Sequence, residues 1–217
     1  MKTLNKTRER FYWDRFRADI EKWCRECHAC GARRGPKKGT KRRLQRCNVG
    51  APFKRMALDI LRPLPVTTKG NRYALVLMDY FTNWTEAIAI PDQKASTVAE
   101  ELVRAWISRY GVPMILHSEQ STIFNSALFN ELYKLLAILK TLTTALHPKS
   151  DGVVERFNRT ILNYLSLYVS KKQTDWDTHL PLFFLAYRSA DHEVTGFTSA
   201  DMIFGQALRL PCNILLG

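Results

Sequence analysis

The chain has 217 residues, of which 46% are hydrophobic and 11% aromatic, enough for one domain with a buried core plus a smaller appendage. It holds no long charge-free apolar run, and its first residues are charged, which argues against a transmembrane helix and against a signal for export. The five cysteines are therefore expected to be thiols or metal ligands rather than disulfides.

The net charge of +13 is concentrated in the first quarter of the chain. Residues 1–55 carry 18 Lys and Arg against 5 Asp and Glu, whereas the remaining residues carry 15 of each. A basic arm on a neutral body indicates a protein that binds a polyanion, and we interpret the partner as nucleic acid. A solubilising tail is the alternative.

The chain begins with a predicted amphipathic helix over residues 8–23, in which apolar residues recur at helical spacing from Phe11 to Trp23. The segment CRECHAC follows, with Cys24, Cys27 and Cys30 three residues apart. Because a structural zinc ion needs four ligands, a CxxC pair supplies half of a site. A zinc knuckle with missing or altered ligands and a set of plain thiols both remain open.

Residues 36–52 form a predicted basic linker that has no acidic residue. Such a segment either lies along phosphates or stays disordered, and it also resembles a nuclear-import signal, so we expect nuclear localisation. Its candidate DNA-binding residues are Lys37, Lys38, Lys41, Arg42 and Arg43.

Three strands are predicted next, over residues 54–63, 71–80 and 84–90, the last two forming a hairpin. Residues 92–110 are predicted as one helix with a capping box of Thr97 and Glu100. A strand over 114–118, a helix over 126–139 and a strand over 141–146 follow. A loop over 147–152 then leads to helices over 153–170 and 176–187. This order predicts an α/β protein with a mixed sheet covered by helices.

Three carboxylates occupy special places in this scheme. Asp59 interrupts an apolar strand, Glu119 follows the fourth strand, and Glu155 is expected in the first turn of the long helix. Strand ends and a helix start can converge on one edge of a sheet. Clustered acids repel one another unless a cation lies between them, and two divalent cations held in this way catalyse phosphoryl transfer. Three solvated surface acids are the alternative, with Glu155 favouring a helix N-terminus.

Five segments resemble the integrase of gypsy-type LTR retrotransposons, a relative of retroviral integrases. They are MALDILRPLP, GNRYALVLMDYFTNWTEA, RYGVPMILHSEQSTIFNSALF, TTALHPKSDGVVERFNRT and TGFTSADMIFGQALRLP. The resemblance runs from about Phe11 to Leu210 and implies a ribonuclease H-like fold with a mixed five-stranded sheet flanked by helices. It also implies a D-D-E triad whose last two acids are separated by 35 residues, which is the number between Glu119 and Glu155. Asp59 matches the first acid.

The resemblance further implies the chemistry. Mg2+ or Mn2+, held by Asp59, Glu119 and Glu155, would activate water to trim a DNA end and then drive attack of the freed 3′-hydroxyl on target DNA. Asn158 and Arg159 match positions that approach the DNA end, and Lys149 is added as a DNA contact. An ion pair between Arg159 and Glu155 is the alternative for that arginine. Family members act as multimers, so a homo-oligomer is expected.

The chain also departs from the family pattern. Glu119 stands where the family has aspartate, and its extra methylene moves the carboxylate by roughly 1.5 Å. Catalytic groups tolerate about 0.5 Å of misplacement, so a loss of rate is expected. Ser121 replaces a glycine and would be strained if the turn needs positive φ. Arg62 and Leu146 are further departures.

The zinc module of the family pairs two upstream histidines with the CxxC that Cys27 and Cys30 match. Those histidines are missing from this sequence, so bound zinc is doubtful and the segment is interpreted as a helical zinc-knuckle remnant. The expected domains are this remnant over 1–35, the basic linker over 36–52 and the catalytic core over 53–217.

Three hypotheses of function follow. The first is a retroelement-derived integrase core with weakened or lost activity. The second is a domesticated, inactive module that binds DNA or acts as a scaffold, and the third is a related metal-dependent nuclease. DNA is the expected partner, and no association with membranes is expected.

Overall fold

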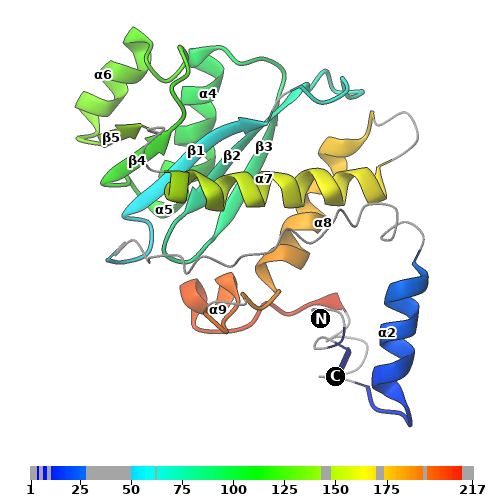
Figure 1. Cartoon of the computed structure of the whole chain (residues 1–217). Helices are drawn as coiled ribbons and strands as arrows, with labels where there is room; N and C mark the ends of the chain where they lie inside the picture. Colours follow the sequence, from blue (N-terminus) through cyan, green and yellow to red (C-terminus); the bar gives the residue numbers. More distant parts are fainter. Residues whose placement is uncertain are drawn as a thin grey trace. The chain divides into compact units, whose positions relative to one another are not determined.

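The computed structural model describes residues 4, 7–8, 11–27, 50–61, 63–142, 148–169, 174–192 and 195–211. Within these ranges, the side chains of residues 142, 148–153, 155 and 167–168 are not described. The chain divides into two compact units, Met1–Gln45 and Arg46–Gly217 (Figure 1). The finer division into 1–35, 36–52 and 53–217 stays a prediction, and Arg62 and Leu146 lie outside the described residues.

The smaller unit contains helix α2, Phe16–Glu26, which begins later than the predicted start at residue 8. Phe16 and Ile20 are buried, but Tyr12 is 94% exposed and Trp23 58% exposed. The predicted apolar stripe is therefore only partly correct. Trp13 closes the start of the helix, since its ring Nε1 donates to the Asp19 carboxylate at 2.8 Å.

The larger unit contains a mixed five-stranded sheet of order β3-β2-β1-β4-β5, which confirms the predicted fold class. β1 pairs antiparallel with β2 and parallel with β4, while β2 pairs antiparallel with β3 and β4 parallel with β5. The strands are β1 Arg55–Leu61, β2 Tyr73–Asp79, β3 Thr85–Ile90, β4 Ile115–Ser118 and β5 Leu139–Leu142.

The helices of this unit depart from the prediction in several places. Their bounds are α4 Ala95–Leu102, the π-helical turn η1 Val103–Ile107, α5 Ser108–Tyr110, α6 Ala127–Leu135, α7 Pro148–Tyr168, α8 Trp176–Arg188 and α9 Ser199–Phe204. The predicted helix over 92–110 thus contains a π-helical turn. Its predicted capping box is wrong, because Lys94 is the N-cap and Thr97 donates its hydroxyl to Asp92 at 2.7 Å.

Two further corrections concern the later helices. The loop expected over 147–152 is helical from Pro148, because proline fits the first position of a helix. Glu155 consequently lies in the third turn of α7 rather than in its first. Helix α9 was not predicted, although the capping box of Thr198 and Asp201 that starts it can be read from the sequence.

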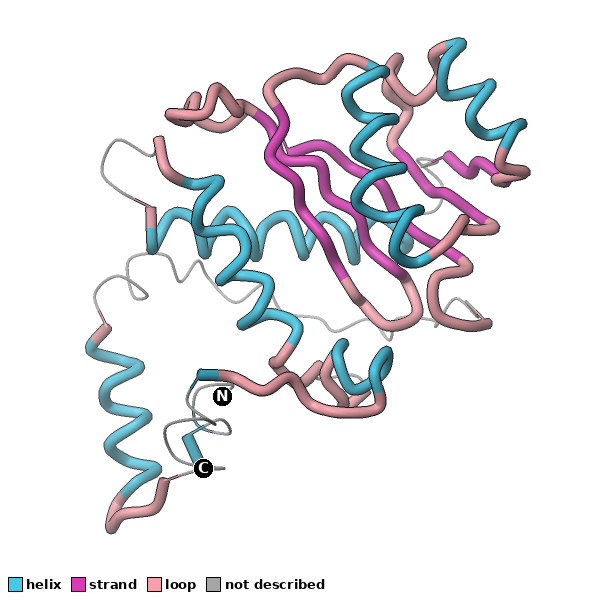
Figure 2. The backbone as a smooth tube through the Cα atoms, turned by 180° about the vertical axis from the view of Figure 1, so that it is seen from behind, coloured by secondary structure: helices cyan, strands magenta, loops and turns pink. Residues whose placement is uncertain are grey.

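Helices cover both faces of the sheet, as Figures 1 and 2 show from opposite sides. Met56 and Leu58 of β1 belong to a core shared with α4, η1 and α6, while Ala57 and Leu61 belong to a second core shared with α7 and α8. Because side chains alternate along a strand, the odd-numbered positions of β1 face α7. Among the described helices, none is both long enough and apolar enough to cross a membrane.

Candidate active site

Asp59 lies on the face of the sheet that α7 covers. It is two residues from both Ala57 and Leu61, which pack into the core beneath α7 and α8. Its side chain is half-buried, and its Oδ1 accepts a hydrogen bond from the backbone N–H of Ile60 at 2.8 Å. The charge that interrupts the apolar strand is therefore directed towards α7, not into the opposite core.

Glu119 is level with Asp59 on the neighbouring strand. The parallel register pairs Ala57 with His117 and Leu58 with Ser118, the last residue of β4. Glu119 therefore follows Ser118 as Asp59 follows Leu58, and neighbouring strands lie about 4.8 Å apart. Glu119 is exposed, as expected at a strand end, and extending the alternation of β4 puts its position on the α7 side.

Helix α7 brings the third acid position to the same place. The side-chain amide of Asn158 donates a hydrogen bond to Oδ2 of Asp59, which fixes this part of the helix above β1. Val154 and Phe157 are buried against the sheet. Glu155 is three residues before Asn158 and shares its side of the helix. The side chain of Glu155 is not described, so the third acid is located by its helix alone.

The oxygen atoms around Asp59 suit a hard divalent cation. Oδ1 of Asn158 is buried and has no hydrogen-bond partner among the described atoms, although the same side chain holds Asp59 through its nitrogen. A buried, unpartnered oxygen beside a carboxylate is explained by a water or an ion. Carboxylate and amide oxygens are the ligands that Mg2+ and Mn2+ prefer. The described side chains contain no group of three metal-binding residues, and Glu155 is not among them.

The loop after Glu119 does not have the strain that the sequence predicted at Ser121. Among the described residues, positive φ outside glycine occurs at Arg15, Phe53, Asn83 and Ala137, not at Ser121. Instead, the Ser121 hydroxyl accepts a hydrogen bond from the backbone N–H of Ile123 at 3.3 Å. The turn does not need positive φ at Ser121, so serine is compatible with it and the condition for strain is not met.

His117 is held in place by its neighbours. It is buried, its Nδ1 lies 3.1 Å from the hydroxyl of Thr141, and its ring meets that of Tyr80 edge-on. These contacts give His117 a structural role beside the loop of Glu119.

Asp79 is a buried acid with a structural part. Its Oδ1 accepts from the backbone N–H of Phe53 at 3.0 Å, and its Oδ2 accepts from the backbone N–H and the hydroxyl of Thr82 at 2.8 and 2.7 Å. Burial raises the pKa of Asp79, and the hydrogen bonds from Thr82 and Phe53 oppose that rise. Its oxygens are occupied in closing the β2–β3 turn and fixing the start of β1.

The remaining predicted site residues are only partly described. Arg159 is exposed on α7, whereas the side chain of Lys149 is not described. Cys27 is half-buried after α2, and Cys30 lies outside the described residues. The basic linker residues Lys37, Lys38, Lys41, Arg42 and Arg43 also lie outside them.

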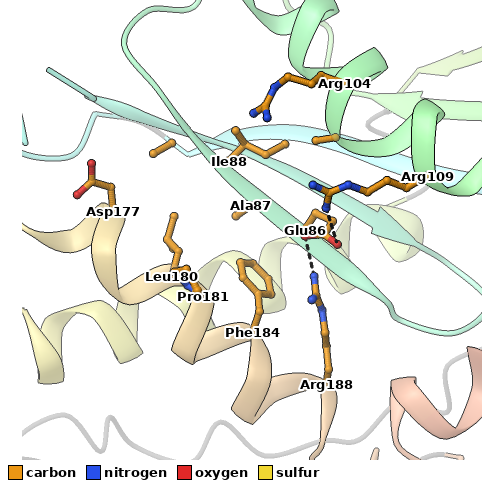
Figure 3. A pocket seen from close by; sticks show the side chains of 12 residues that line it. Glu86, Ala87, Ile88, Arg104, Arg109, Asp177, Leu180, Pro181, Phe184 and Arg188 are labelled. Atoms are coloured by element: carbon orange, nitrogen blue, oxygen red, sulfur yellow. Dashed lines mark ion pairs between the residues drawn. The ribbon is translucent and has the colours of Figure 1, made fainter. Parts of the chain in front are cut away.

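A hollow of about 380 Å³ lies at the exposed edge of β3, between the α4–α5 helical segment and α8 (Figure 3). Arg104 and Arg109 line one wall, and residues of α8 line the other. Glu86 forms ion pairs with Arg188 at 2.7 Å and with Arg109 at 4.0 Å. Of the described predicted acids, neither Asp59 nor Glu119 lines this hollow, so we treat it separately from the candidate active site.

Comparison with known sequences gives two results. Residues 1–36 match the family described as integrase zinc binding domain. Over 210 residues, 97% of this chain, the sequence is 30% identical to the retrovirus-related Pol polyprotein from transposon 412 of Drosophila melanogaster. The chain spans 17% of the length of that polyprotein.

Comparison with solved structures agrees with the fold. The catalytic core domain of BIV integrase matches 70% of this chain and 95% of its own length, with a TM-score of 0.56 and 25% identity. The HTLV-2 integrase catalytic core domain, solved in complex with magnesium in a trimeric form, matches 70% of this chain and 97% of its own length. Its TM-score is 0.56 and its identity 18%. The larger unit therefore has the ribonuclease H-like fold that the sequence predicted.

Proposed function

The chain is a relative of retrotransposon and retroviral integrases, and from this relationship we propose that its larger unit is an integrase core that acts on DNA with a divalent metal. The reaction is the trimming of a DNA 3′-end followed by transfer of that end into target DNA. Its rate is weakened because Glu119 replaces the aspartate of the family pattern.

One observation carries the proposal. Asp59 and the position of Glu119 are level on adjacent parallel strands, and Asn158 ties the helix of Glu155 to Asp59. The positions of Asp59 and Glu119 and the helix that carries Glu155 thus lie on one face of the sheet, which supports a shared metal site. The alternative is that the three acids are unrelated surface residues. In that case, neither the strand register nor the docking of α7 would be expected to bring their positions together.

The residues have distinct parts in this proposal. Asp59, fixed by the Ile60 N–H and by Asn158, supplies the most rigid carboxylate. Glu119 and Glu155 complete the set of oxygen ligands. Bound Mg2+ or Mn2+ would lower the pKa of the attacking water or hydroxyl and would stabilise the negative charge on the leaving oxygen. Arg159, exposed on the same helix, is suited to a phosphate of the DNA end.

The longer side chain of Glu119 is the reason to expect weak activity. A displacement near 1 Å in an active site can cost about 10²-fold in rate. We therefore expect Glu119→Asp to raise Mn2+-dependent joining of DNA duplexes to a plasmid by about that factor. The DNA duplexes should carry randomised terminal sequences, so that the assay does not depend on one particular DNA end.

The same assay decides between this proposal and its alternative. Activity in the wild type or in Glu119→Asp supports an integrase core. If both are inert while DNA binding persists and weakens with salt, the chain is a domesticated, inactive DNA-binding or scaffolding module. The basic residues of the first quarter would serve that module as well as the enzyme. Cleavage without joining would favour the third hypothesis, a nuclease.

Several expectations complete the proposal. DNA is the partner, and a homo-oligomer can be tested by analytical ultracentrifugation. Nuclear localisation can be tested by imaging a tagged chain. Since residues 1–36 contain one histidine, His28, we expect less than one zinc per chain by elemental analysis of purified protein.

A further inference from the structure

Lys140 on β5 holds the far end of the loop that begins with Glu119. Its ammonium donates a hydrogen bond to the backbone carbonyl of Phe124 at 2.6 Å and another to the side-chain oxygen of Asn125. It also lies over the ring of Tyr133, 5.5 Å from the ring centroid. The three donors of one ammonium group are thus directed at the loop and at α6.

The loop also has short-range contacts of its own. Asn125 donates its side-chain amide to the carbonyl of Ser121 at 3.1 Å, and Ser126 caps α6 by accepting from the backbone N–H of Phe129. Phe124 is buried against Phe129, with ring centroids 5.5 Å apart. Lys140 links this unit to the strand next to β4, so it fixes the loop relative to the sheet.

Partial burial of the Lys140 ammonium costs desolvation free energy, and its hydrogen bonds offset this cost. Burial lowers the pKa of Lys140, because the charged form loses water. A partly buried ammonium group is tolerated when hydrogen bonds compensate for the water that it has lost. The backbone of Lys140 pairs with Leu116 of β4, three residues before Glu119, so Lys140 lies on the strand next to the one that leads into the loop.

We propose that Lys140 is a positioning residue for Glu119: it anchors the loop of residues 119–126 so that the glutamate carboxylate stays near Asp59. This inference rests on the proposed function, because it assigns Lys140 a part in holding the metal ligand. In this inference Lys140 acts through its hydrogen bonds to Phe124 and Asn125 and not as a metal ligand itself.

Two measurements on the full chain test it. Mn2+ affinity is measured by titration calorimetry, with Asp59→Asn as the variant that defines the specific signal. Hydrogen exchange of residues 121–129 reports the order of the loop. Residues that orient a metal ligand typically contribute 10–100-fold to affinity, so we expect Lys140→Met to weaken Mn2+ binding about tenfold and to speed exchange in the loop.

A matched control and a conservative variant sharpen the test. Lys134 on α6 is exposed and pairs with Glu131 at 3.0 Å, so Lys134→Met should change neither measurement. Lys140→Arg keeps the charge and the donors and should recover most of the lost affinity. A general loss of stability would lower the thermal midpoint without this selective recovery.

The outcomes are distinct. If wild type and Asp59→Asn bind Mn2+ equally, the proposed function fails, and the positioning role fails with it. If wild type binds specifically but Lys140→Met keeps its affinity, the positioning inference alone is overturned. Unchanged exchange of the loop in Lys140→Met would overturn it as well.

Discussion

Two aspartates on adjacent strands of one sheet, Asp59 and Asp79, have opposite surroundings. Asp79 is fully buried and accepts three hydrogen bonds, from Phe53 and Thr82, that close the β2–β3 turn. Asp59 is half-buried, faces α7 and adjoins an amide oxygen of Asn158 that has no partner among the described atoms. Asp59 interrupts an apolar strand and Asp79 ends one, yet of the two only Asp59 has an unpartnered oxygen beside it that could join it in binding a cation.

This difference separates a structural acid from a candidate ligand. A buried carboxylate whose lone pairs are all used can stabilise a turn but cannot coordinate a metal without breaking its own contacts. A half-buried carboxylate beside further acid positions gains from a cation, because the cation relieves their repulsion. Substitutions at the two aspartates test the comparison.

The largest effect is expected from Asp59→Asn. Replacing this ligand should lower Mn2+-dependent DNA joining by at least about 10³-fold, because several kcal/mol of metal-assisted stabilisation are lost. The measurement is best made in the Glu119→Asp background, where the signal is larger. The thermal midpoint should stay within about 2 °C, since the side chain is not part of a core. Retained joining would refute the assignment of Asp59.

Asp79→Ala should have its effect on stability instead. It leaves the N–H groups of Phe53 and Thr82 and the Thr82 hydroxyl without their acceptor, at an expected cost of about 3 kcal/mol in the free energy of unfolding. Urea denaturation measures this cost. Asp59→Ala is the matched control and should cost less than about 1 kcal/mol. Equal losses of unfolding free energy in Asp79→Ala and Asp59→Ala would contradict the view that only Asp79 is a structural acid.

The smallest effect, a change in the free energy of unfolding, is expected at Ala137. This residue lies in the turn between α6 and β5, away from both aspartates. Its φ of 52° is favourable for glycine and strained for alanine. Ala137→Gly should therefore raise the free energy of unfolding by about 1 kcal/mol in urea denaturation. The same substitution at the exposed helical Ala186 should lower it by about 1 kcal/mol. A loss at Ala137 would contradict the strain argument.

Local patterns in the sequence predicted most elements of the larger unit. Alternation and apolar runs located the first four strands, and glycine and proline marked the ends of most helices. The fifth strand begins at Leu139, two residues before its predicted start, because the helix predicted to reach residue 139 ends at Leu135. The errors occurred where local signals competed. Pro148 to Gly152 had the composition of a turn but starts α7, and Thr97 had the spacing of a cap but bonds to Asp92.

The candidate site was predicted through residue identity and the 35-residue spacing, not through geometry. Lys140 was missed, although a single charge in the apolar segment around β5 was a signal that could have been read. The sequence could not show whether the turn at Ser121 needs positive φ; in the structure the Ser121 hydroxyl bonds to the backbone and the turn forms without it.

The sequence by itself determined the order of the strands and of most helices and the basic first quarter, because these depend on composition and short-range periodicity, while its resemblance to an integrase family singled out the three acids. The tertiary structure decided that Asp59 and Glu119 are level on neighbouring strands, that Asn158 holds α7 above Asp59, and that Asp79 is already satisfied. These facts depend on strand register and helix docking, which arise from contacts between residues far apart in the chain.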